Sequence, residues 1–301
     1  MQIADEIKKL KKEKDAVILA HYYTSPEIQD IADYVGDSYY LSKLAINLPQ
    51  EKIIFCGVSF MGESACILNP GKKVFMPDLT ADCAMAHMAD VKTIERMREK
   101  YDDLAVVCYI NSTAELKQHC DVCVTSANAV KIVKALPNKN IFLIPDKNLA
   151  HYVATQVPEK HFIFNEGYCP IHENMQEEEI RKLKASHTNA PVLVHPECNE
   201  KIRELADFLG STSQIIEYAQ KCEAEELIIG TEIGVLYELK KRCPYKTFYF
   251  PQTKPICEDM KKITLHKIYQ ILLEEENKIV VSEELRVHSK KPLEQMLELA
   301  K

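Results

Sequence analysis

Residues 72–83 read KKVFMPDLTADC, a short apolar run followed by a polar hinge and a single cysteine. The same arrangement recurs at 160–169 (KHFIFNEGYC) and at 246–257 (KTFYFPQTKPIC), so Cys83, Cys169 and Cys257 lie 86 and 88 residues apart. Self-similarity at a fixed period is the signature of an internal repeat. The spacing therefore predicts three homologous units that each end in one thiol.

Apolar runs that are typical of buried parallel strands keep nearly the same period. They occur at 16–23, 104–111 and 191–197, and again at 52–58, 140–145 and 226–232, and a third set precedes the cysteines. Helical patterns lie between and around these runs, at 1–14, 26–44, 63–68, 93–100, 127–135, 177–184, 199–208, 214–221, 260–275 and from 291 onward, and a short strand is expected at 278–281.

Strands that alternate with helices indicate βαβ units and parallel sheets. The sequence thus predicts an α/β fold of three homologous αβα sandwich units with small parallel sheets, arranged around a pseudo-three-fold axis. The expected units are 1–83 with the tail 258–301 packed back onto it, 84–169, and 170–257. Because ligands bind off the carboxyl ends of the strands in open α/β sheets, we expect one central active site.

The composition limits the classes of function. The chain has 301 residues and 46% hydrophobic residues, and no run approaches the ~20 apolar residues of a membrane span. The net charge of −7 gives no overall basic field, so nucleic acid and membrane are not expected partners. The chain starts with a charged, amphipathic helical pattern instead of a signal peptide. Its eleven cysteines are therefore expected to be reduced thiols in the cytoplasm rather than the disulfides of a secreted protein.

Three thiolates brought to one axis could bind an iron–sulfur cluster and leave one iron with an open position, which suits a catalytic cluster. The other cysteines occur mostly in apolar surroundings and are interpreted as small buried hydrophobes. Cys120 and Cys123 have the CxxC spacing of metal and redox sites, but a single such pair is a weak signal. Cys198 is interpreted as packing near the site rather than as a ligand.

The ends of the first strands carry titratable side chains, namely His21, Tyr22, Tyr23, Tyr109, Asn111, His195 and Glu197. Imidazole, phenol and carboxylate groups can transfer protons near neutral pH once burial adjusts their pKa values. Ser38, Ser126, Ser211 and Thr212 precede helical patterns, where they could simply cap the helices. Alternatively, three helix N-termini that face one cavity could hold carboxylates or phosphate.

Together the segments AHYY (20–23), GDS (36–38), YINSTAE (109–115), VTSANAV (124–130), CPIH (169–172), VHPEC (194–198), GST (210–212) and GTEIG (230–234) resemble the quinolinate synthase family of de novo NAD biosynthesis. The resemblance covers nearly the whole chain. It implies the three-unit fold and a 4Fe–4S cluster whose three ligands match Cys83, Cys169 and Cys257. Ala84 follows the first of them where relatives often have proline, and the CxxCxxC of some relatives around the last ligand is absent.

The resemblance also implies the reaction, in which iminoaspartate and dihydroxyacetone phosphate condense to quinolinate with loss of phosphate and two waters. The open iron would act as a Lewis acid, while Tyr23, Glu197, Tyr109 and His21 would transfer protons. The expected substrate-binding residues are His21, Ser38, Tyr109, Asn111, Ser126, His172, His195, Glu197, Ser211 and Thr212, together with the turn 230–234. Iminoaspartate could come from an aspartate oxidase, an aspartate dehydrogenase, or oxaloacetate and ammonia.

Three alternatives remain open. A zinc hydrolase would use the same ligand types at shorter spacing. A non-catalytic iron–sulfur sensor would leave the titratable strand ends without a role. A radical enzyme that uses S-adenosylmethionine would need a CxxxCxxC loop, which this chain lacks.

Overall fold

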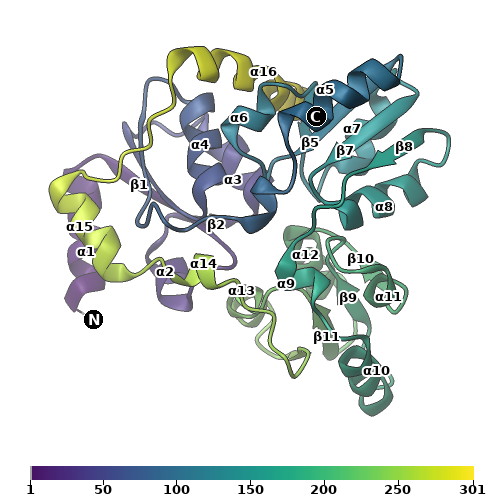
Figure 1. The fold of residues 1–301 in the computed structure, drawn as a ribbon. Coiled ribbons are helices and arrows are strands. Elements are labelled where there is room, and N and C mark those ends of the chain that lie inside the picture. Colours follow the sequence, from purple (N-terminus) through teal and green to yellow (C-terminus); the bar gives the residue numbers. More distant parts are fainter. Residues whose placement is uncertain (1) are drawn as a thin grey trace.

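Three separate parallel sheets of four strands each organise the chain, and all three have the same strand order. The structure is a computed structural model that describes residues 2–301. The sheets lie around a common centre, with the first unit in purple and blue, the second in teal and the third in green (Figure 1). The predicted α/β class with three αβα units is confirmed, whereas the residue boundaries of the units remain a prediction.

The first sheet has the order β2-β1-β3-β4. Its strands are β1 (Ala16–His21), β2 (Tyr34–Gly36), β3 (Lys52–Cys56) and β4 (Lys73–Phe75), and its helices are α1 (Gln2–Glu13), α2 (Pro26–Ile31), α3 (Ser38–Ala45) and α4 (Ser59–Leu68). Strand β1 is buried along its whole length, as expected for a central strand with helices on both faces.

The second sheet has the order β6-β5-β7-β8 and the third has the order β10-β9-β11-β12. The second unit contains the 3-10 helix η1 (Ala84–His87), α5 (Val91–Lys100), β5 (Leu104–Tyr109), α6 (Ala114–Lys117), β6 (Val122–Val124), α7 (Ala129–Ala135), β7 (Asn140–Ile144), α8 (Lys147–Gln156) and β8 (His161–Phe164). The third contains α9 (Pro170–Glu173), α10 (Glu177–Ser186), β9 (Val192–Val194), α11 (Glu200–Arg203), β10 (Phe208–Leu209), α12 (Thr212–Lys221), β11 (Glu226–Gly230), α13 (Val235–Arg242) and β12 (Thr247–Tyr249).

One hydrogen bond recurs in every unit, where an aspartate just before the edge strand accepts from a backbone N–H of the central first strand. The three pairs are Ile18 with Asp33, Val106 with Asp121 and Val192 with Asp207, at 2.9, 2.7 and 2.9 Å. These aspartates lie 88 and 86 residues apart. The repeat therefore extends to individual side-chain contacts as well as to strand order.

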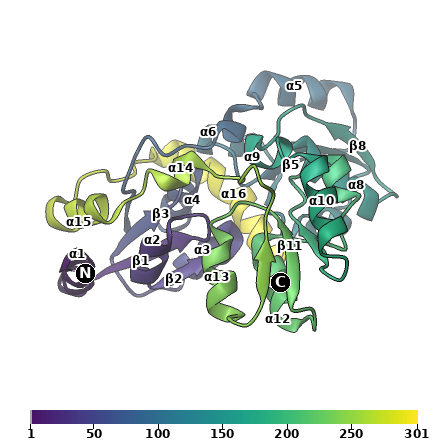
Figure 2. The same ribbon diagram turned by 90° about the horizontal axis from the view of Figure 1, so that it is seen from below.

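The chain ends in α14 (Glu258–Lys261), α15 (Leu265–Glu274) and α16 (Glu283–Leu299). Helix α15 packs on α1. Helix α16, however, contacts α4 of the first unit and also α6, β6 and α7 of the second (Figure 2). Its Leu293 and Met296 belong to one hydrophobic core that includes residues of both units, so the tail joins two units rather than covering one.

Several predicted elements differ from the observed ones. The helix expected at 26–44 is divided into α2 and α3 by the edge strand β2, because Asp37 has an extended backbone and caps α3 by accepting a bond from Tyr40 N–H. The helix expected at 199–208 stops after Arg203, since Phe208–Leu209 pair with β9. The helix at 260–275 is interrupted before Thr264, whose side chain caps α15.

Helices α6, α8, α9 and α13 were not predicted, and further differences lie nearer the two ends of the chain. Residues 278–281 form only an isolated antiparallel bridge between Lys278 and Phe75 instead of a strand. The last helix starts at Glu283 rather than 291, because Ser282 caps it and Pro292 is accommodated inside it. The predicted first helix is observed from Gln2, and Met1 lies outside the described residues.

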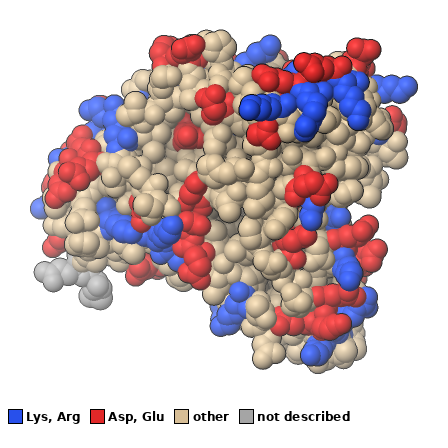
Figure 3. All heavy atoms as spheres, viewed as in Figure 1, with Lys and Arg blue, Asp and Glu red and all other residues tan. Residues whose placement is uncertain are grey.

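The surface carries mixed charge. On the face seen in Figure 3, Lys and Arg side chains are interspersed with Asp and Glu side chains. None of the described helices combines the length and apolar character needed to cross a bilayer.

Candidate active site

A cavity of about 260 Å³ is lined by residues that follow strands of all three sheets. Of the predicted turn 230–234, only Glu232 lines it. All individually predicted site residues except one also line it: His21, Tyr23, Ser38, Cys83, Tyr109, Asn111, Ser126, Cys169, His172, His195, Glu197, Thr212 and Cys257. The exception is Ser211, whose hydroxyl accepts from Gln214 N–H in a capping box at the start of α12. One cavity thus collects side chains that are up to 236 residues apart in sequence.

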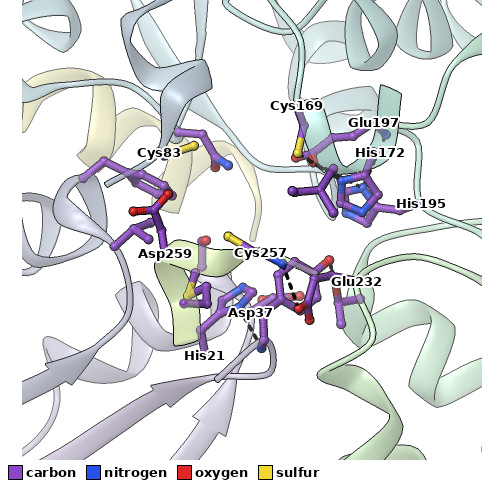
Figure 4. A pocket seen from close by; sticks show the side chains of 18 of the residues that line it. His21, Asp37, Cys83, Cys169, His172, His195, Glu197, Glu232, Cys257 and Asp259 are labelled. Carbon is purple, nitrogen blue, oxygen red and sulfur yellow. Dashed lines mark hydrogen bonds and ion pairs between the residues drawn. The ribbon is translucent and has the colours of Figure 1, made fainter. Parts of the chain in front are cut away.

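Three thiols face this cavity, one from the end of each unit (Figure 4). Cys83, Cys169 and Cys257 each have an extended backbone immediately before a short helix. Burial raises the pKa of Cys83 to about 12 and that of Cys257 to about 11. The free thiols are therefore protonated, and three converging thiolates would need a positive centre beside them, which a metal cluster provides.

The other cysteines do not line the cavity, and all eleven lack a disulfide partner. Cys123 is buried within strand β6, and Cys120 is buried just before it. The Cys120 Sγ lies 3.2 Å from the Leu116 carbonyl oxygen. Cys198 is fully buried behind Glu197 and contacts the Gly230 carbonyl through its sulfur. Among the residues that the structure describes, the cavity wall thus offers three thiols and no fourth, a donor set that would suit a cluster with one open metal.

A buried carboxylate, Glu197, lies on the wall next to Cys169. Its Oε1 accepts a hydrogen bond from the Tyr109 hydroxyl at 2.5 Å, and its Oε2 lies 2.8 Å from His172 Nδ1. Ligand atoms of Cys169, His172 and Glu197 lie within 4.8 Å of one another and form a group that could also hold a metal ion. Burial opposes the charge of Glu197, but the neighbouring histidines and the hydrogen bonds from His172 and Tyr109 outweigh it and lower its pKa.

The first strands of units one and three end in the same local structure. The Tyr23 N–H donates to His21 Nδ1 at 3.1 Å, and the Glu197 N–H donates to His195 Nδ1 at 3.3 Å. Each imidazole therefore has its proton on Nε2, and that of His195 lies 3.2 Å from the Ser126 hydroxyl. Burial lowers the pKa of both His21 and His195 to about 3, so both are neutral hydrogen-bond donors at pH 7.

Two tyrosines complete the titratable set. The Tyr23 hydroxyl lies 2.8 Å from the Thr212 hydroxyl and 2.8 Å from the Thr231 hydroxyl. Burial, followed by the nearby negative charge of Glu197, raises the pKa of Tyr23 and of Tyr109 well above the ordinary value. At neutral pH the imidazoles of His21 and His195 and both phenols are therefore neutral, while Glu197 is an ionised carboxylate beside the three thiols. The lining also includes the carboxyl groups of Asp37, Asp82, Glu232, Glu258 and Asp259.

Several contributors were not predicted. Glu232, in the segment 230–234, is fully buried and accepts from Cys257 N–H at 3.1 Å, from Gly234 N–H at 2.6 Å and from Lys261 Nζ at 2.9 Å. The turn that was expected to bind a substrate anion thus presents its Gly234 N–H to its own carboxylate. Asp82 likewise accepts from Cys83 N–H, at 2.8 Å. Two features of the sequence could have indicated these contributors: Asp82 directly precedes Cys83, and Glu232 lies on a turn bounded by Gly230 and Gly234.

The comparisons with known proteins agree with this geometry. The family described as Quinolinate synthetase A protein matches residues 5–298. A quinolinate synthase of Fusobacterium nucleatum is 56% identical over 296 residues, which cover 98% of this chain and 99% of that protein. Those of Clostridioides difficile and Caldicellulosiruptor bescii are 52% and 50% identical, and each covers at least 97% of both chains. The chain therefore belongs to the quinolinate synthetase A protein family, a family of enzymes of NAD biosynthesis.

Proposed function

We propose that this protein is a quinolinate synthase that condenses iminoaspartate with dihydroxyacetone phosphate to quinolinate, with loss of phosphate and two waters. The observation that carries the proposal is the meeting of three thiols, one from each unit, on the cavity that also holds Glu197, Tyr109 and Tyr23. Cys83, Cys169 and Cys257 would hold a 4Fe–4S cluster. When bound, this cluster supplies a Lewis-acidic iron that makes a hydroxyl group easier to lose as water.

The neutral donors would orient the anionic substrates. His195 Nε2–H and the Ser126 hydroxyl lie together on one wall, and the Thr212 hydroxyl lies beside Tyr23 on another. Asn111 and Ser38 add polar groups to the same cavity. Uncharged donors can bind a carboxylate by hydrogen bonds without a buried cationic side chain. We assign Ser211 to the support of Thr212, because its hydroxyl is engaged in the cap of α12.

Glu197 would act as the base and Tyr23 as the acid. Glu197 stays ionised because His172 and Tyr109 stabilise its charge, so it can accept a proton from the carbon that forms the new bond. Tyr23 keeps its proton until a leaving hydroxide takes it, since burial raises its pKa. Tyr109 would hold Glu197 in position, and neutral His21 would donate a hydrogen bond to the substrate through Nε2.

The chemistry also suggests where the substrate comes from. Imines hydrolyse in water, so iminoaspartate must be supplied by an enzyme that oxidises aspartate, either an oxidase or a dehydrogenase, or must form from oxaloacetate and ammonia. We place the reaction in the cytoplasm, where all eleven cysteines would stay reduced as the structure has them.

The test is anaerobic purification, metal and sulfide analysis, and a titration with quinolinate. We expect a brown protein with a broad band near ~400 nm that quinolinate perturbs. We also expect that replacing any one of Cys83, Cys169 or Cys257 with serine removes the cluster and the activity together. Cys120→Ser and Cys123→Ser are matched controls that should retain both.

Other results would select the alternatives. A variant of a proposed ligand that keeps the full cluster signal would refute the ligand assignment. A colourless protein with stoichiometric zinc would favour a hydrolase at the Cys169, His172 and Glu197 group. The Glu197→Gln variant separates an enzyme from a sensor, because loss of a positioned base lowers the rate roughly 10²- to 10⁴-fold whereas a sensor would be unaffected.

A further inference from the structure

Tyr23 lies on a tight turn that leaves the first sheet at the end of β1. The last sheet-type hydrogen bond of this strand runs from the Tyr22 N–H to the Gly36 carbonyl oxygen at 3.1 Å. The Thr24 N–H then donates to the His21 carbonyl oxygen at 3.0 Å and closes the turn. Residues 22–24, hereafter the Tyr23 loop, have carbonyl groups that lie beyond this pairing. Buried backbone carbonyls need hydrogen-bond partners, so this loop depends on side chains for them.

One buried side chain binds the carbonyl groups on both sides of Tyr23. Gln29, on α2 and 2% exposed, donates from Nε2 to the Tyr22 and Thr24 carbonyl oxygens, each at 2.9 Å. The same Nε2 lies 3.2 Å from the Gly234 carbonyl oxygen in the third unit. Carbonyl oxygens can only accept, so the amide must present its nitrogen to all three. These contacts therefore define the orientation of the Gln29 amide and connect the Tyr23 loop with the turn 230–234.

The Tyr23 loop and the turn 230–234 approach each other so closely that only glycine fits between them. A Cβ at Gly234 would lie 2.7 Å from the Tyr23 Cα and 2.8 Å from the Tyr22 carbonyl oxygen. Both are backbone atoms, and such close approach of two backbones is a position that requires glycine. The same turn also contacts the side chain of this tyrosine, since the Thr231 and Tyr23 hydroxyls lie 2.8 Å apart. The distance between the loop and the turn therefore determines where the phenol points.

The contacts of Gln29 have a cost, which indicates that its nitrogen has a specific use. Its Oε1 is buried and has no hydrogen-bond partner among residues 2–301. An unsatisfied buried acceptor is unfavourable, so an apolar side chain of the same shape would serve the packing of α2 better. The third carbonyl of the Tyr23 loop, that of Tyr23 itself, accepts from Lys261 Nζ, which also pairs with Glu232 of the turn. Gln29 differs from Lys261 because it binds backbone groups of both segments and is buried.

We propose that Gln29 is a positioning residue for Tyr23: its amide holds the Tyr23 loop against the turn 230–234 and so directs the phenol into the cavity. The inference rests on the proposed function, in which Tyr23 gives its proton to a leaving hydroxide. Gln29 does not line the cavity, so its effect must pass through the loop. His21 should be affected less, because its backbone is paired with Gly36 inside the sheet. Loss of the amide should therefore slow the reaction more than it weakens substrate binding.

The experiment is a double-mutant cycle in the cluster-loaded enzyme, with Gln29→Met, Tyr23→Phe and the combined variant. Methionine has nearly the shape of glutamine without its N–H groups. Gln29→Met should lower kcat roughly 10- to 100-fold, with KM for both substrates changed less than about threefold. In the Tyr23→Phe background the same substitution should lower kcat by less than about twofold, because the hydroxyl that it positions is already absent.

Asn69→Leu is the matched control. It removes another buried amide of the first unit, which donates to the Ala65 carbonyl oxygen at 2.8 Å and does not line the cavity. This variant should be less stable than the original but should keep its kcat. Cluster absorbance and thermal unfolding are measured on every variant, so that loss of the cluster or of the fold is recognised.

Hydrogen exchange on the same anaerobic preparations adds a measurement that needs no substrate. Gln29→Met should exchange faster than the original in peptides that cover the Tyr23 loop and the turn 230–234, whereas Asn69→Leu should not. Gly234→Ala separates the same two segments from the other side. It should reproduce both the loss of kcat and the faster exchange, and it decides the question if Gln29→Met does not fold.

Three results would overturn the proposal: an unchanged kcat in Gln29→Met, unchanged exchange of the two segments, or equal fold losses with and without the Tyr23 hydroxyl. If the unsubstituted enzyme forms no quinolinate at all, the proposed function fails instead. Hydrogen exchange then decides by itself whether Gln29 holds the loop against the turn.

Discussion

Replacing Lys261 with methionine would leave the carboxylate of Glu232 buried without its cationic partner. Glu232 is 0% exposed, and Lys261 Nζ lies 2.9 Å from its Oε1 while also donating to the Tyr23 carbonyl. Breaking a buried ion pair by removing one partner costs about 3–5 kcal/mol. We expect the lower end, about 3 kcal/mol, because the N–H groups of Cys257 and Gly234 still bind the carboxylate and the Lys261 side chain is 26% exposed.

The assay is urea unfolding followed by far-ultraviolet circular dichroism on four proteins: the original, Lys261→Met, Glu232→Gln and the double variant. The amide of Glu232→Gln keeps an oxygen for one N–H group and needs no counter-charge, so the double variant should be less destabilised than the sum of the single ones. We expect a coupling energy of about 2 kcal/mol. Glu232 binds the Cys257 N–H, so the ion pair with Lys261 should stabilise the loop that carries Cys257. A decrease in the free energy of unfolding below about 1 kcal/mol for Lys261→Met, or additive effects of the single substitutions, would refute this reasoning.

Three further predictions concern stability. Burial lowers the pKa of His21 and His195 to about 3, against 6.5 for an exposed imidazole, so the unfolded state binds more protons than the folded state as the pH falls below 6.5. The free energy of unfolding should therefore decrease by roughly 4 kcal/mol between pH 7 and pH 5. Urea unfolding midpoints at the two pH values test this, and unchanged midpoints would contradict it. Removing the α12 cap with Ser211→Ala should cost about 1 kcal/mol, measured in the same way, and a neutral result would show that the capping box is dispensable. In Gly62→Ala the new Cβ would clash with the Met76 sulfur, so the protein should be destabilised by about 1–3 kcal/mol although alanine is the better helix former. A gain in the thermal midpoint would mean that Met76 moves aside freely.

Much of the fold could be predicted because the period of the cysteines agrees with that of the buried strands. The long apolar runs became central strands, since burial on both faces leaves a strong pattern. The short edge strands β2, β6 and β10 were missed; β2 and the start of β10 lie within patterns that fit the helices expected at 26–44 and 199–208. The expected helix at 26–44 is the clearest case, because its apolar residues fit a helix but Asp37 caps a new one instead.

The site could be predicted where the chemistry depends on the type of a single residue, such as a cysteine thiol. The three thiols and the ends of the first strands line the cavity as expected, since equivalent positions of the repeat must face the same centre. Thr231 and Glu232 could not be found in this way, because they contribute through contacts with Tyr23 and Lys261 in other segments. A threonine after a strand has many common uses, and only the folded chain shows which groups it joins.

The placement of α16 has a consequence for the synthesis of the protein. The core shared by the first two units includes Leu293 and Met296, whereas the strands of these units all precede residue 165. While the ribosome is making the end of the third unit, the strands of the first two have already left the exit tunnel, but the elements that α16 contacts still lack this helix. Their core closes only when α16 emerges, so the apolar side chains that Leu293 and Met296 cover lack this partner on the nascent chain until then.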